Sequence, residues 1–284
     1  MHGKLRIRLA SLLLSLVVAS AARADELSLT IGATKSTQLS GLFDYILPIF
    51  KAASNLSVHV IAIDPSQAVA IEKRGDTGAL LLDDRAAEDK IVADGYGLGH
   101  HPALYNEFVI VGPSADPAGI RGIKDAGKAF AQIAAKGALF AGSGDDSSAS
   151  RTELRLWKSA GIQPDKRGAW YHDLGKGMAA TLTDAAAMHA YTLADRGTWA
   201  NFKNRETLEV LSEGDPALLE IYSSILVSPE KQSRNPLVYA QIWDGWLTDK
   251  HGSAAITSYK INGEQIFFPC QGSALALCTA APRR

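Results

Sequence analysis

The chain has 284 residues, of which 46% are hydrophobic, and its formal net charge is −1. This length is enough for one large domain or for two lobes of roughly average domain size. Acidic and basic residues nearly balance and the basic ones form no block, which excludes nucleic acid or an anionic membrane surface as the main partner.

Residues 1–24 have the pattern of a secretory signal peptide. Three basic residues precede an apolar run over 9–19, and Ala22 and Ala24 form a small-residue cleavage site. The apolar run is too short for a good membrane span. No cysteine lies at the cleavage point, so nothing there suggests a lipid anchor. We therefore expect a periplasmic protein of Gram-negative type that begins near Asp25 and is not embedded in the membrane.

After this segment, apolar runs of strand length alternate with helical patterns. The strand-like runs cover residues 27–31, 58–63, 79–82, 108–111, 138–141 and 190–193. Helical spacing relates Phe43, Leu47 and Phe50 between the first two runs, and Leu154 and Trp157 between the last two. This alternation predicts an α/β fold with parallel sheets flanked by helices.

Two stretches predict crossovers between lobes. Residues 108–113 form a strand that ends in Gly-Pro before a turn-rich segment, and residues 221–229 form a second strand-like run that ends in Pro. A chain that leaves one lobe and returns to it has two hinge strands, which permit closure around a ligand. We predict one lobe from residues 25–112 and 222–269, a second lobe from residues 113–221, and a C-terminal tail at 270–284.

Three loops lead from a strand into a helix, where open α/β sheets bind their ligands. Helix N-termini offer unpaired backbone N–H groups and a positive dipole end, which suit an anion. The first loop, residues 32–41, holds four hydroxyls and one ammonium group within seven residues, and Ser40 is expected to be the N-cap of the next helix. Its candidate ligand contacts are the donors Thr34, Lys35, Ser36 and Thr37. The alternative is an ordinary capped loop without a ligand.

The second loop covers residues 142–150, where Ser150 and Glu153 fit a capping box. Its glycines allow backbone N–H groups to converge on an anion, whereas Asp145 and Asp146 are expected to brace the loop. The candidate ligand contacts here are Ser143, Gly144 and Ser147.

The third loop contains Gly175, Lys176 and Gly177 at the start of a helix. A Gly-x-Gly sequence alone is a weak signal, and we expect the Lys176 side chain to be solvated. The backbone N–H of Gly177 is the candidate ligand contact.

Cys270 and Cys278 are the two cysteines of the chain, and both lie in the C-terminal tail. In an oxidising compartment such a pair commonly forms a disulfide, and the alternative is two unpaired thiols in a flexible tail. A zinc site is not expected, since no nearby His or Cys completes a set of four ligands.

Nine short segments share a pattern with a known family. They are SGLFDYILP at 40–48, YNEFVIVGP at 105–113, DPAGI at 116–120, GDDS at 144–147, LW at 156–157, AG at 160–161, GKGM at 175–178, AYTLADRGT at 190–198 and EGD at 213–215. Through them the chain resembles the periplasmic tungstate-binding proteins of ABC uptake systems over nearly all of residues 29–269. The resemblance implies a two-lobed periplasmic binding protein fold of the type II-like kind, an oxyanion ligand such as tungstate or molybdate, and as partners a transporter permease with its ATPase. We expect a monomer without a cofactor.

The ligand-contacting positions depart from the family pattern. Lys35 stands in place of a hydroxyl residue, Ser143 in place of an anion-binding arginine, and Asp83 in place of a histidine at the end of a strand. The family's second contact loop, Gly-Thr-Gly, reads Asp64-Pro65-Ser66 here, which makes Ser66 the ligand candidate of that loop.

These departures change the charge of the expected pocket. Loss of the arginine removes a charge-assisted, bidentate contact, which Lys35 replaces only as a point charge. A carboxylate at Asp64 facing a dianion at ~4 Å would cost about 4 kcal/mol for each unit of ligand charge at an effective dielectric of ~20. Either Asp64 turns away, or it pairs with Lys35, or the ligand is not a simple dianion. The identity of the ligand therefore stays open.

Two other functions compete with oxyanion transport. The same fold can serve a sensor, or can take a neutral or cationic ligand through Asp64 and Asp83. An enzyme is not expected, because the sequence holds no G-x-S-x-G, no H-E-x-x-H and no phosphate-binding G-x-x-x-x-G-K-[ST] motif. We expect His100 and His101 to lie in a hinge-side loop rather than in a metal site.

Overall fold

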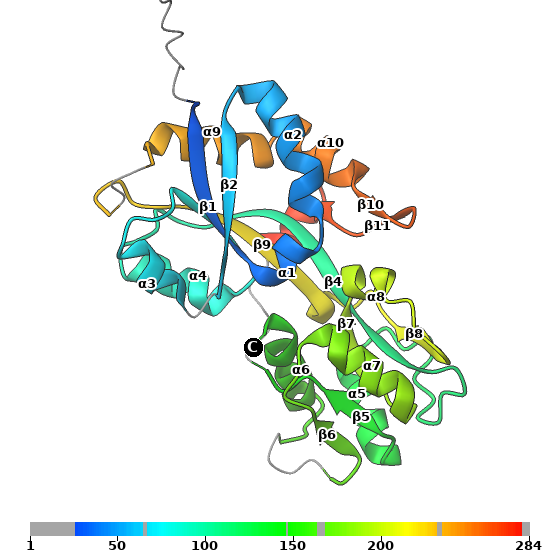
Figure 1. Ribbon diagram of the computed structural model, residues 1–284. Helices are drawn as coiled ribbons and strands as arrows, with labels where there is room; N and C mark the ends of the chain where they lie inside the picture. The colour runs from blue at the N-terminus through cyan, green and yellow to red at the C-terminus, as the bar shows by residue number, and fades with distance from the viewer. Residues whose placement is uncertain (1–25, 65–66, 146, 164–167, 232–234, 280–284) are drawn as a thin grey trace, which may run out of the picture.

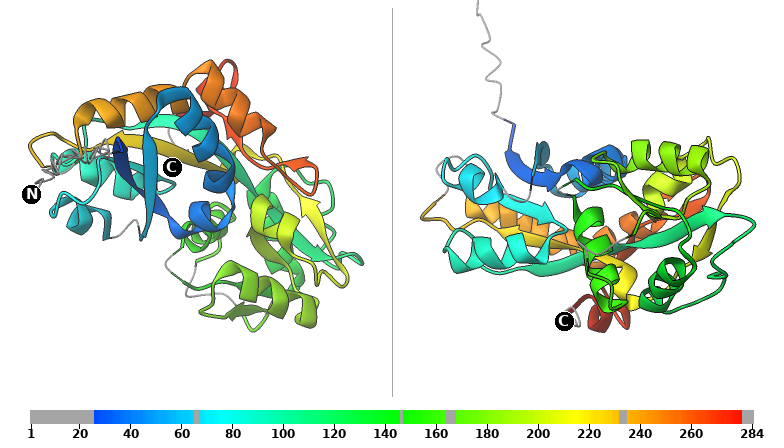
Figure 2. Two further views of the ribbon diagram at one scale, coloured as in Figure 1. Left: turned by 45° about the horizontal axis from the view of Figure 1, so that its top comes forward. Right: turned by 90° about the horizontal axis from the view of Figure 1, so that it is seen from below.

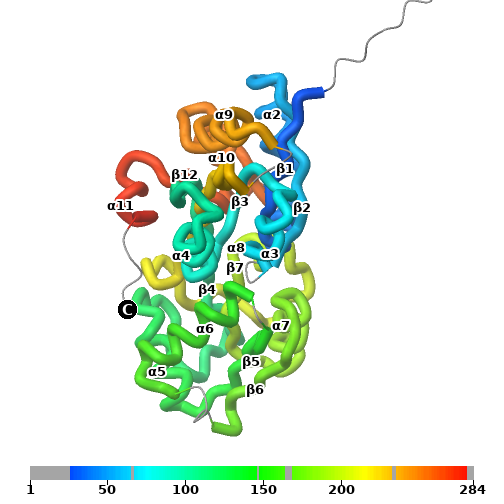
Figure 3. Tube along the Cα trace, turned by 90° about the vertical axis from the view of Figure 1, so that its left-hand side faces the viewer, coloured from blue at the N-terminus to red at the C-terminus, as the bar shows by residue number. Residues whose placement is uncertain are grey.

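The computed structural model describes residues 26–64, 67–145, 147–163, 168–231 and 235–279. The expected signal peptide at 1–24 lies outside these residues, as do Ser66 and Asp146. The chain forms two α/β lobes, which Figure 1 shows one above the other and Figure 3 shows from the side. No helix among the described residues is long and apolar enough to span a membrane.

The sheet of the first lobe contains six strands in the order β12-β4-β9-β3-β1-β2. They are β1 (Ser28–Thr34), β2 (Ser57–Ile63), β3 (Ala79–Leu82), β4 (His101–Pro113), β9 (Leu219–Leu226) and β12 (Phe268–Pro269). β1 is parallel to β2 and β3, as the alternating pattern predicts. β9 is antiparallel to both β3 and β4, so the sheet is mixed.

The second lobe is built on the C-terminal half of β4. Its other strands are β5 (Phe140–Gly142), β6 (Tyr171–Asp173), β7 (Thr192–Asp195) and β8 (Leu208–Ser212). β4 lies between β7 and β8 and is antiparallel to both, whereas β5 and β6 form a parallel pair. A bridge between Phe140 and Tyr191 joins that pair to the start of β7.

Helices cover the sheets of both lobes (Figures 1 and 2). Those of the first lobe are α1 (Lys35–Leu39), α2 (Leu42–Ser54), α3 (Ala68–Glu72), α4 (Arg85–Ala93), α9 (Leu237–Leu247), α10 (Lys250–Ser258) and α11 (Ala274–Thr279), with the hairpin β10 (Lys260–Ile261) and β11 (Glu264–Gln265). Those of the second lobe are α5 (Ala126–Lys136), α6 (Ser148–Ser159), α7 (Met178–Met188), α8 (Arg196–Asn201) and the short 3-10 helix η3 (Pro216–Leu218).

β4 and β9 carry the chain between the lobes. β4 pairs with β9 up to Glu107 and with β7 from Phe108 onward. Leu218 belongs to the core of the second lobe, and Leu219 starts β9 opposite Glu107. The two crossings therefore lie side by side. The expected strand at 108–113 starts earlier, at His101, and the strand expected at 221–229 is β9, which starts at Leu219 and already ends at Leu226.

Each lobe has its own aromatic core. In the first lobe Phe50 packs edge-on against Trp243 and Trp246, with ring centroids 5.2 Å apart in both pairs. In the second lobe Trp157 contacts Phe130 at 4.3 Å and Phe140 at 4.9 Å between centroids. Burying rings of this size supplies most of the apolar area that stabilises a small lobe.

The expected N-cap at Ser40 is wrong by one residue. Gly41, with φ of +81°, is the N-cap of α2, because the loop forms the short helix α1 and the chain must reverse sharply between the two helices. A positive φ strains any residue with a Cβ, so glycine suits this position. The Ser40 hydroxyl instead accepts the Leu42 N–H at 3.2 Å and donates to the Thr37 carbonyl at 2.6 Å.

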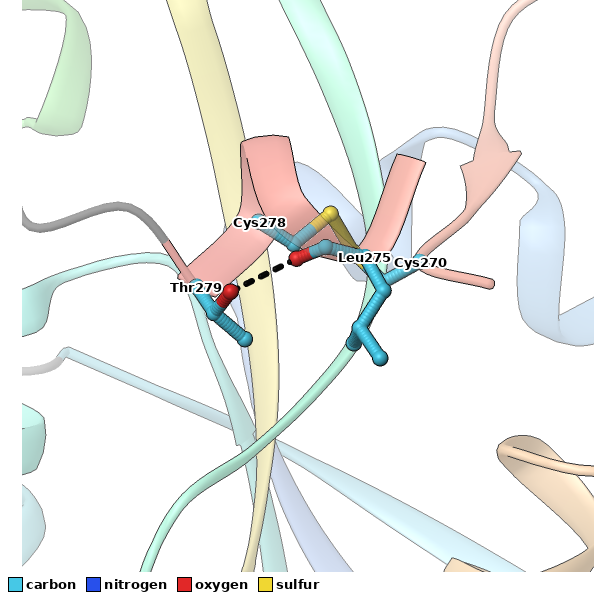
Figure 4. The surroundings of a disulfide bond; sticks show 4 residues. All are labelled: Cys270, Leu275, Cys278 and Thr279. Carbon is cyan, nitrogen blue, oxygen red and sulfur yellow. Dashed lines mark hydrogen bonds between the residues drawn. A yellow bond between two sulfur atoms is a disulfide. The ribbon is translucent and has the colours of Figure 1, made fainter. Parts of the chain in front are cut away.

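The C-terminal tail is fastened to the first lobe. Cys270 and Cys278 form a disulfide, with their Cα atoms 5.9 Å apart, and both side chains are buried (Figure 4). The Cys270 N–H donates to the Ala103 carbonyl on β4 at 3.0 Å, and α11 contacts β4. The disulfide therefore holds α11 against a crossover strand.

Replacing both Cys270 and Cys278 by serine should lower the free energy of unfolding by about 2–3 kcal/mol, because the closed loop no longer restricts the unfolded chain. Urea unfolding followed by tryptophan fluorescence measures this change. Thr279→Ala is the control, since it removes only the exposed hydrogen bond to the Leu275 carbonyl seen in Figure 4. Equal stability of the double serine variant and the wild type would contradict the prediction.

Candidate functional site

The first loop places a cluster of hydroxyls at the carboxyl end of β1. Thr34 Oγ1 lies 2.7 Å from Thr37 Oγ1 and 3.1 Å from Ser36 Oγ. Thr34 and Thr37 are buried, whereas Lys35 and Ser36 are exposed. The four predicted contacts of this loop therefore lie together, with Lys35 and Ser36 on the outer side.

Asp83 joins this cluster from the neighbouring strand. Because β1 and β3 are parallel, with Ala33 opposite Leu81, their carboxyl ends meet at one edge of the sheet. Asp83 follows β3, and its Oδ2 accepts hydrogen bonds from Thr34 at 3.1 Å and from Ser36 at 3.3 Å. Asp64, at the end of β2, is exposed.

The second loop forms a network of hydroxyls around one carboxylate. Ser143 Oγ lies 2.7 Å from Ser150 Oγ, which in turn donates to Asp145 Oδ1 at 2.9 Å. Ser147, not Ser150, caps α6, because its side chain accepts the Ser150 N–H at 3.3 Å. The expected capping box is therefore wrong, whereas the expected bracing role of Asp145 is what the contacts show.

Glu153, the other half of the expected capping box, lies in the core beneath the loop. Its Oε1 accepts hydrogen bonds from Trp157 Nε1 at 3.0 Å and from the Tyr171 hydroxyl at 2.7 Å. The carboxylate is therefore held by two aromatic donors.

The third loop is attached to the second. The N–H groups of Leu174 and Lys176 donate to the carbonyls of Gly142 at 3.0 Å and Ser143 at 2.7 Å. The Lys176 ammonium group pairs with Asp184 at 2.6 Å and is half exposed. Gly177 is the N-cap of α7, so no side chain caps the first turn of this helix from that position. The three loops thus form two groups. The first loop lies on the first lobe, and the second and third loops lie together on the second lobe.

Residues in the first turn of α6 contact the first lobe and so connect these two groups of loops across the lobe junction. Arg151 Nη2 lies 2.6 Å from Asp84 Oδ2, next to Asp83 on the first lobe. Ser148 Oγ donates to Glu220 Oε1 at 2.6 Å, and Glu220 lies on β9. In Figure 1, α6 is the helix of the second lobe that lies below α1. The loops that follow Gly32 and Gly142 therefore face one junction.

Three carboxyls lie at this junction. Burial raises the pKa of Asp83 to about 6, and burial, with added repulsion from Asp83 and Asp195, raises the pKa of Glu220 to about 8. Burial also raises the pKa of Asp195, which caps α8 by accepting the Thr198 N–H at 2.8 Å. Desolvation disfavours the charged form of a carboxyl, so the junction favours protonated groups.

The comparisons with known proteins agree with this architecture. A family model described as a PBP superfamily domain matches residues 19–249. The chain belongs to the PBP superfamily. It is 39% identical over 246 residues to a Haloferax volcanii protein named as an ABC transporter anion-binding protein, covering 85% of this chain and 71% of that one. It is 35% identical over 234 residues to the tungstate-binding protein TupA of Peptoclostridium acidaminophilum, covering 82% and 81%.

A solved structure gives the same result. The tungstate-binding protein TupA from Desulfovibrio alaskensis G20 superposes with a TM-score of 0.80 at 33% identity, covering 86% of this chain and 98% of that one. The chain is thus a member of the family that contains the tungstate-binding proteins. The predicted two-lobed periplasmic binding protein fold, type II-like, is confirmed.

An arginine fixes the crossing point of this PBP superfamily chain. The Arg196 guanidinium on α8 pairs with Glu107 on β4, with Glu213 and, at 3.0 Å, with Glu264 on the hairpin of the first lobe. His101, which was expected in a loop, is instead the first residue of β4, six positions before Glu107, and it contacts Asp244 at 2.9 Å. Among the described residues, no group of three His, Cys, Asp or Glu side chains is placed to hold a metal ion.

Sequence reasoning missed Glu220 and Asp195. A charged residue inside the apolar run Leu219-Glu220-Ile221-Tyr222 was the available signal for Glu220, because a charge is buried in a strand only with partners. Asp195 lies within a segment that carries the family resemblance, but the pattern gave no reason to place it near Asp83.

Gly142→Ala should lower the free energy of unfolding by about 1–3 kcal/mol through overpacking. A Cβ atom there would clash with the Tyr171 hydroxyl and lie 2.9 Å from Glu153 Oε1. Urea unfolding measures the loss. Gly245→Ala, in α9 with no atom within 4 Å of its Cβ, is the matched control and should be neutral or slightly stabilising. A neutral Gly142→Ala variant would show that the loop tolerates the added atom.

Arg151→Ala should increase the radius of gyration in solution, because it removes a contact that joins the lobes. Small-angle X-ray scattering measures this value. Arg121→Ala serves as control, since Arg121 pairs with Glu209 at 2.9 Å within the second lobe and is comparably exposed. An unchanged radius in both variants would mean that the Arg151–Asp84 pair does not hold the lobes together.

Proposed function

We propose that this protein is an exported periplasmic solute-binding protein that captures a small oxyanion between its lobes and delivers it to an ABC transporter. The observation that carries the proposal is the convergence of hydroxyl-rich loops from both lobes on one junction. Ser36 and Ser148 lie on opposite lobes and donate to Asp83 and Glu220, and these two carboxyls are close enough for Asp83 to raise the pKa of Glu220. The names of the relatives, which include anion-binding and tungstate-binding proteins, support an oxyanion.

The proposed ligand contacts come from both lobes. They are Thr34, Lys35, Ser36 and Thr37 on the first loop, Ser66 after β2, and Ser143, Gly144, Ser147 and Gly177 on the second lobe. Hydroxyls and backbone N–H groups are donors that suit the oxygens of such an anion. The positive end of the α6 dipole and the Lys35 ammonium group supply the charge that the family takes from an arginine.

The same proposal covers the organisation of the chain. The proposed lobes are residues 25–112 with 222–269 and residues 113–221, with both boundaries inside the crossover strands β4 and β9, and 270–284 form the tail. A signal peptide at 1–24 directs export to the periplasm, where the monomer meets a permease with its ATPase. The relatives are binding proteins, which supports a role without catalysis.

A cationic or proton-donating ligand is the second candidate, and one observation favours it. The hydroxyls at the junction donate their single protons to carboxyl groups, so toward a ligand they can act only as acceptors. Lys35→Ala separates the two candidates. The substitution should strongly weaken the binding of an oxyanion and should weaken the binding of a cation little or not at all.

Titration calorimetry with tungstate, molybdate, sulfate and phosphate tests the proposal. Ser36→Ala should weaken the bound oxyanion about tenfold or more, because a hydrogen bond to a charged group contributes about 1.5–3 kcal/mol. Ser258→Ala is the matched control, since Ser258 is an exposed serine of the first lobe that bonds only the Ala254 carbonyl of its own helix. Absence of binding by all four anions would overturn the oxyanion proposal.

A further inference from the structure

The hydroxyls at the lobe junction donate their protons to carboxylates. Thr34 and Ser36 donate to Asp83, whereas Ser148 and Tyr222 donate to Glu220 at 2.6 and 2.7 Å. Each hydroxyl has a single proton. A hydroxyl that donates to a carboxylate has none left for an oxyanion, and the carboxylate itself repels one.

We propose that Asp83 couples oxyanion binding to the uptake of one proton. The inference rests on the oxyanion function proposed above and deepens it. When Asp83 takes a proton from solvent, it loses its negative charge and releases the Thr34 and Ser36 hydroxyls to donate to the ligand. The neutral carboxyl also gains an O–H donor of its own. The anion and the proton therefore enter the site together.

The surroundings of Asp83 are acidic from every side. On its own segment Asp84 is paired with Arg151 from α6, and Glu88 on α4 is buried beside it. β9 contributes Glu220 and Tyr222, and the charge of Asp83 helps to raise the pKa of both groups.

More distant groups complete this environment. Asp195, the last residue of β7, acts on Glu220, and Lys35 on α1 is the exposed cation next to Ser36. Arg85, at the start of α4, acts on Glu88. An incoming anion adds a further negative charge, so proton uptake at this place relieves the repulsion.

Asp83 rather than Glu220 is the group that changes. Glu220 is almost fully buried, and burial raises its pKa to about 8 against the opposing effect of the Ser148 and Tyr222 hydroxyls, so it is already protonated near neutral pH. Asp83 is half-buried, and the pKa to which burial raises it is about 6, so it is ionised in the free protein at neutral pH. Ligand binding must then raise the pKa of Asp83.

The sign of the pH dependence follows from this difference. A group that is ionised when free and protonated when bound weakens binding about tenfold for each pH unit above its free pKa. The affinity for a dianion should therefore be highest near pH 6 and fall as the pH rises through 7 and 8.

Calorimetric titration with molybdate between pH 6.5 and 8.5, in pairs of buffers with different ionisation enthalpies, tests the inference. The wild type is compared with Asp83→Asn, whose amide imitates a neutral carboxyl. The control is Asp89→Asn, because Asp89 is an exposed carboxylate on α4 that pairs with Arg85. Thermal melting confirms that the variants fold.

At pH 7, where Glu220 is still protonated, the wild type and Asp89→Asn should take up close to one proton per molybdate, and between pH 6.5 and 7.5 they should lose about tenfold in affinity. Asp83→Asn should take up none at pH 7 and keep one affinity over that interval. If molybdate binds but Asp83→Asn retains the wild-type slope, or the wild type takes up no proton, the inference is wrong while the proposed function stands. If no oxyanion binds to wild type or variant at any pH, the proposed function fails as well.

Discussion

The pairing of β4 with β9 is the constraint on which the rest of the molecule depends. Both crossings between the lobes lie in this one pair of strands, where Glu107 is opposite Leu219. The lobes can therefore move about a single pair of neighbouring segments without breaking a sheet. Arg196 on α8 braces this pair of strands, because it forms ion pairs with Glu107 on β4, with Glu213 and with Glu264 on the hairpin. The position of the loops on each lobe follows from this junction.

The junction brings together groups with opposing requirements. An anion needs hydroxyl and N–H donors, and the ends of β1 and α6 supply them. Buried carboxyls need the same donors, because a buried charge without partners is costly. Asp83, Asp145 and Glu220 each take two hydroxyls from this set. At the proposed site, the protonation state of Asp83 therefore bears on whether the Thr34 and Ser36 hydroxyls are available to a ligand.

Elements with strong local patterns agree with the sequence-based prediction. The run at 79–82 is β3, and Phe43, Leu47 and Phe50 lie on α2 as their helical spacing predicts. β4 was predicted too short. Its first half mixes buried positions with half-buried and exposed ones and contains Asn106 and Glu107, whereas its second half, from Phe108, is continuously buried. Only the second half has the apolar run by which a buried strand is recognised.

The sequence by itself determined the alternation of strands and helices, the three loops between them and the family to which they point, because these features depend on local spacing and on short segments. The tertiary structure alone decided which side chains meet: Asp83 with Thr34, Asp84 with Arg151, and Glu220 with Ser148. These partners are far apart in the chain and become neighbours through strand order and the crossing of β4 and β9. A local pattern reports which face of an element is apolar, but it does not report what lies opposite that face.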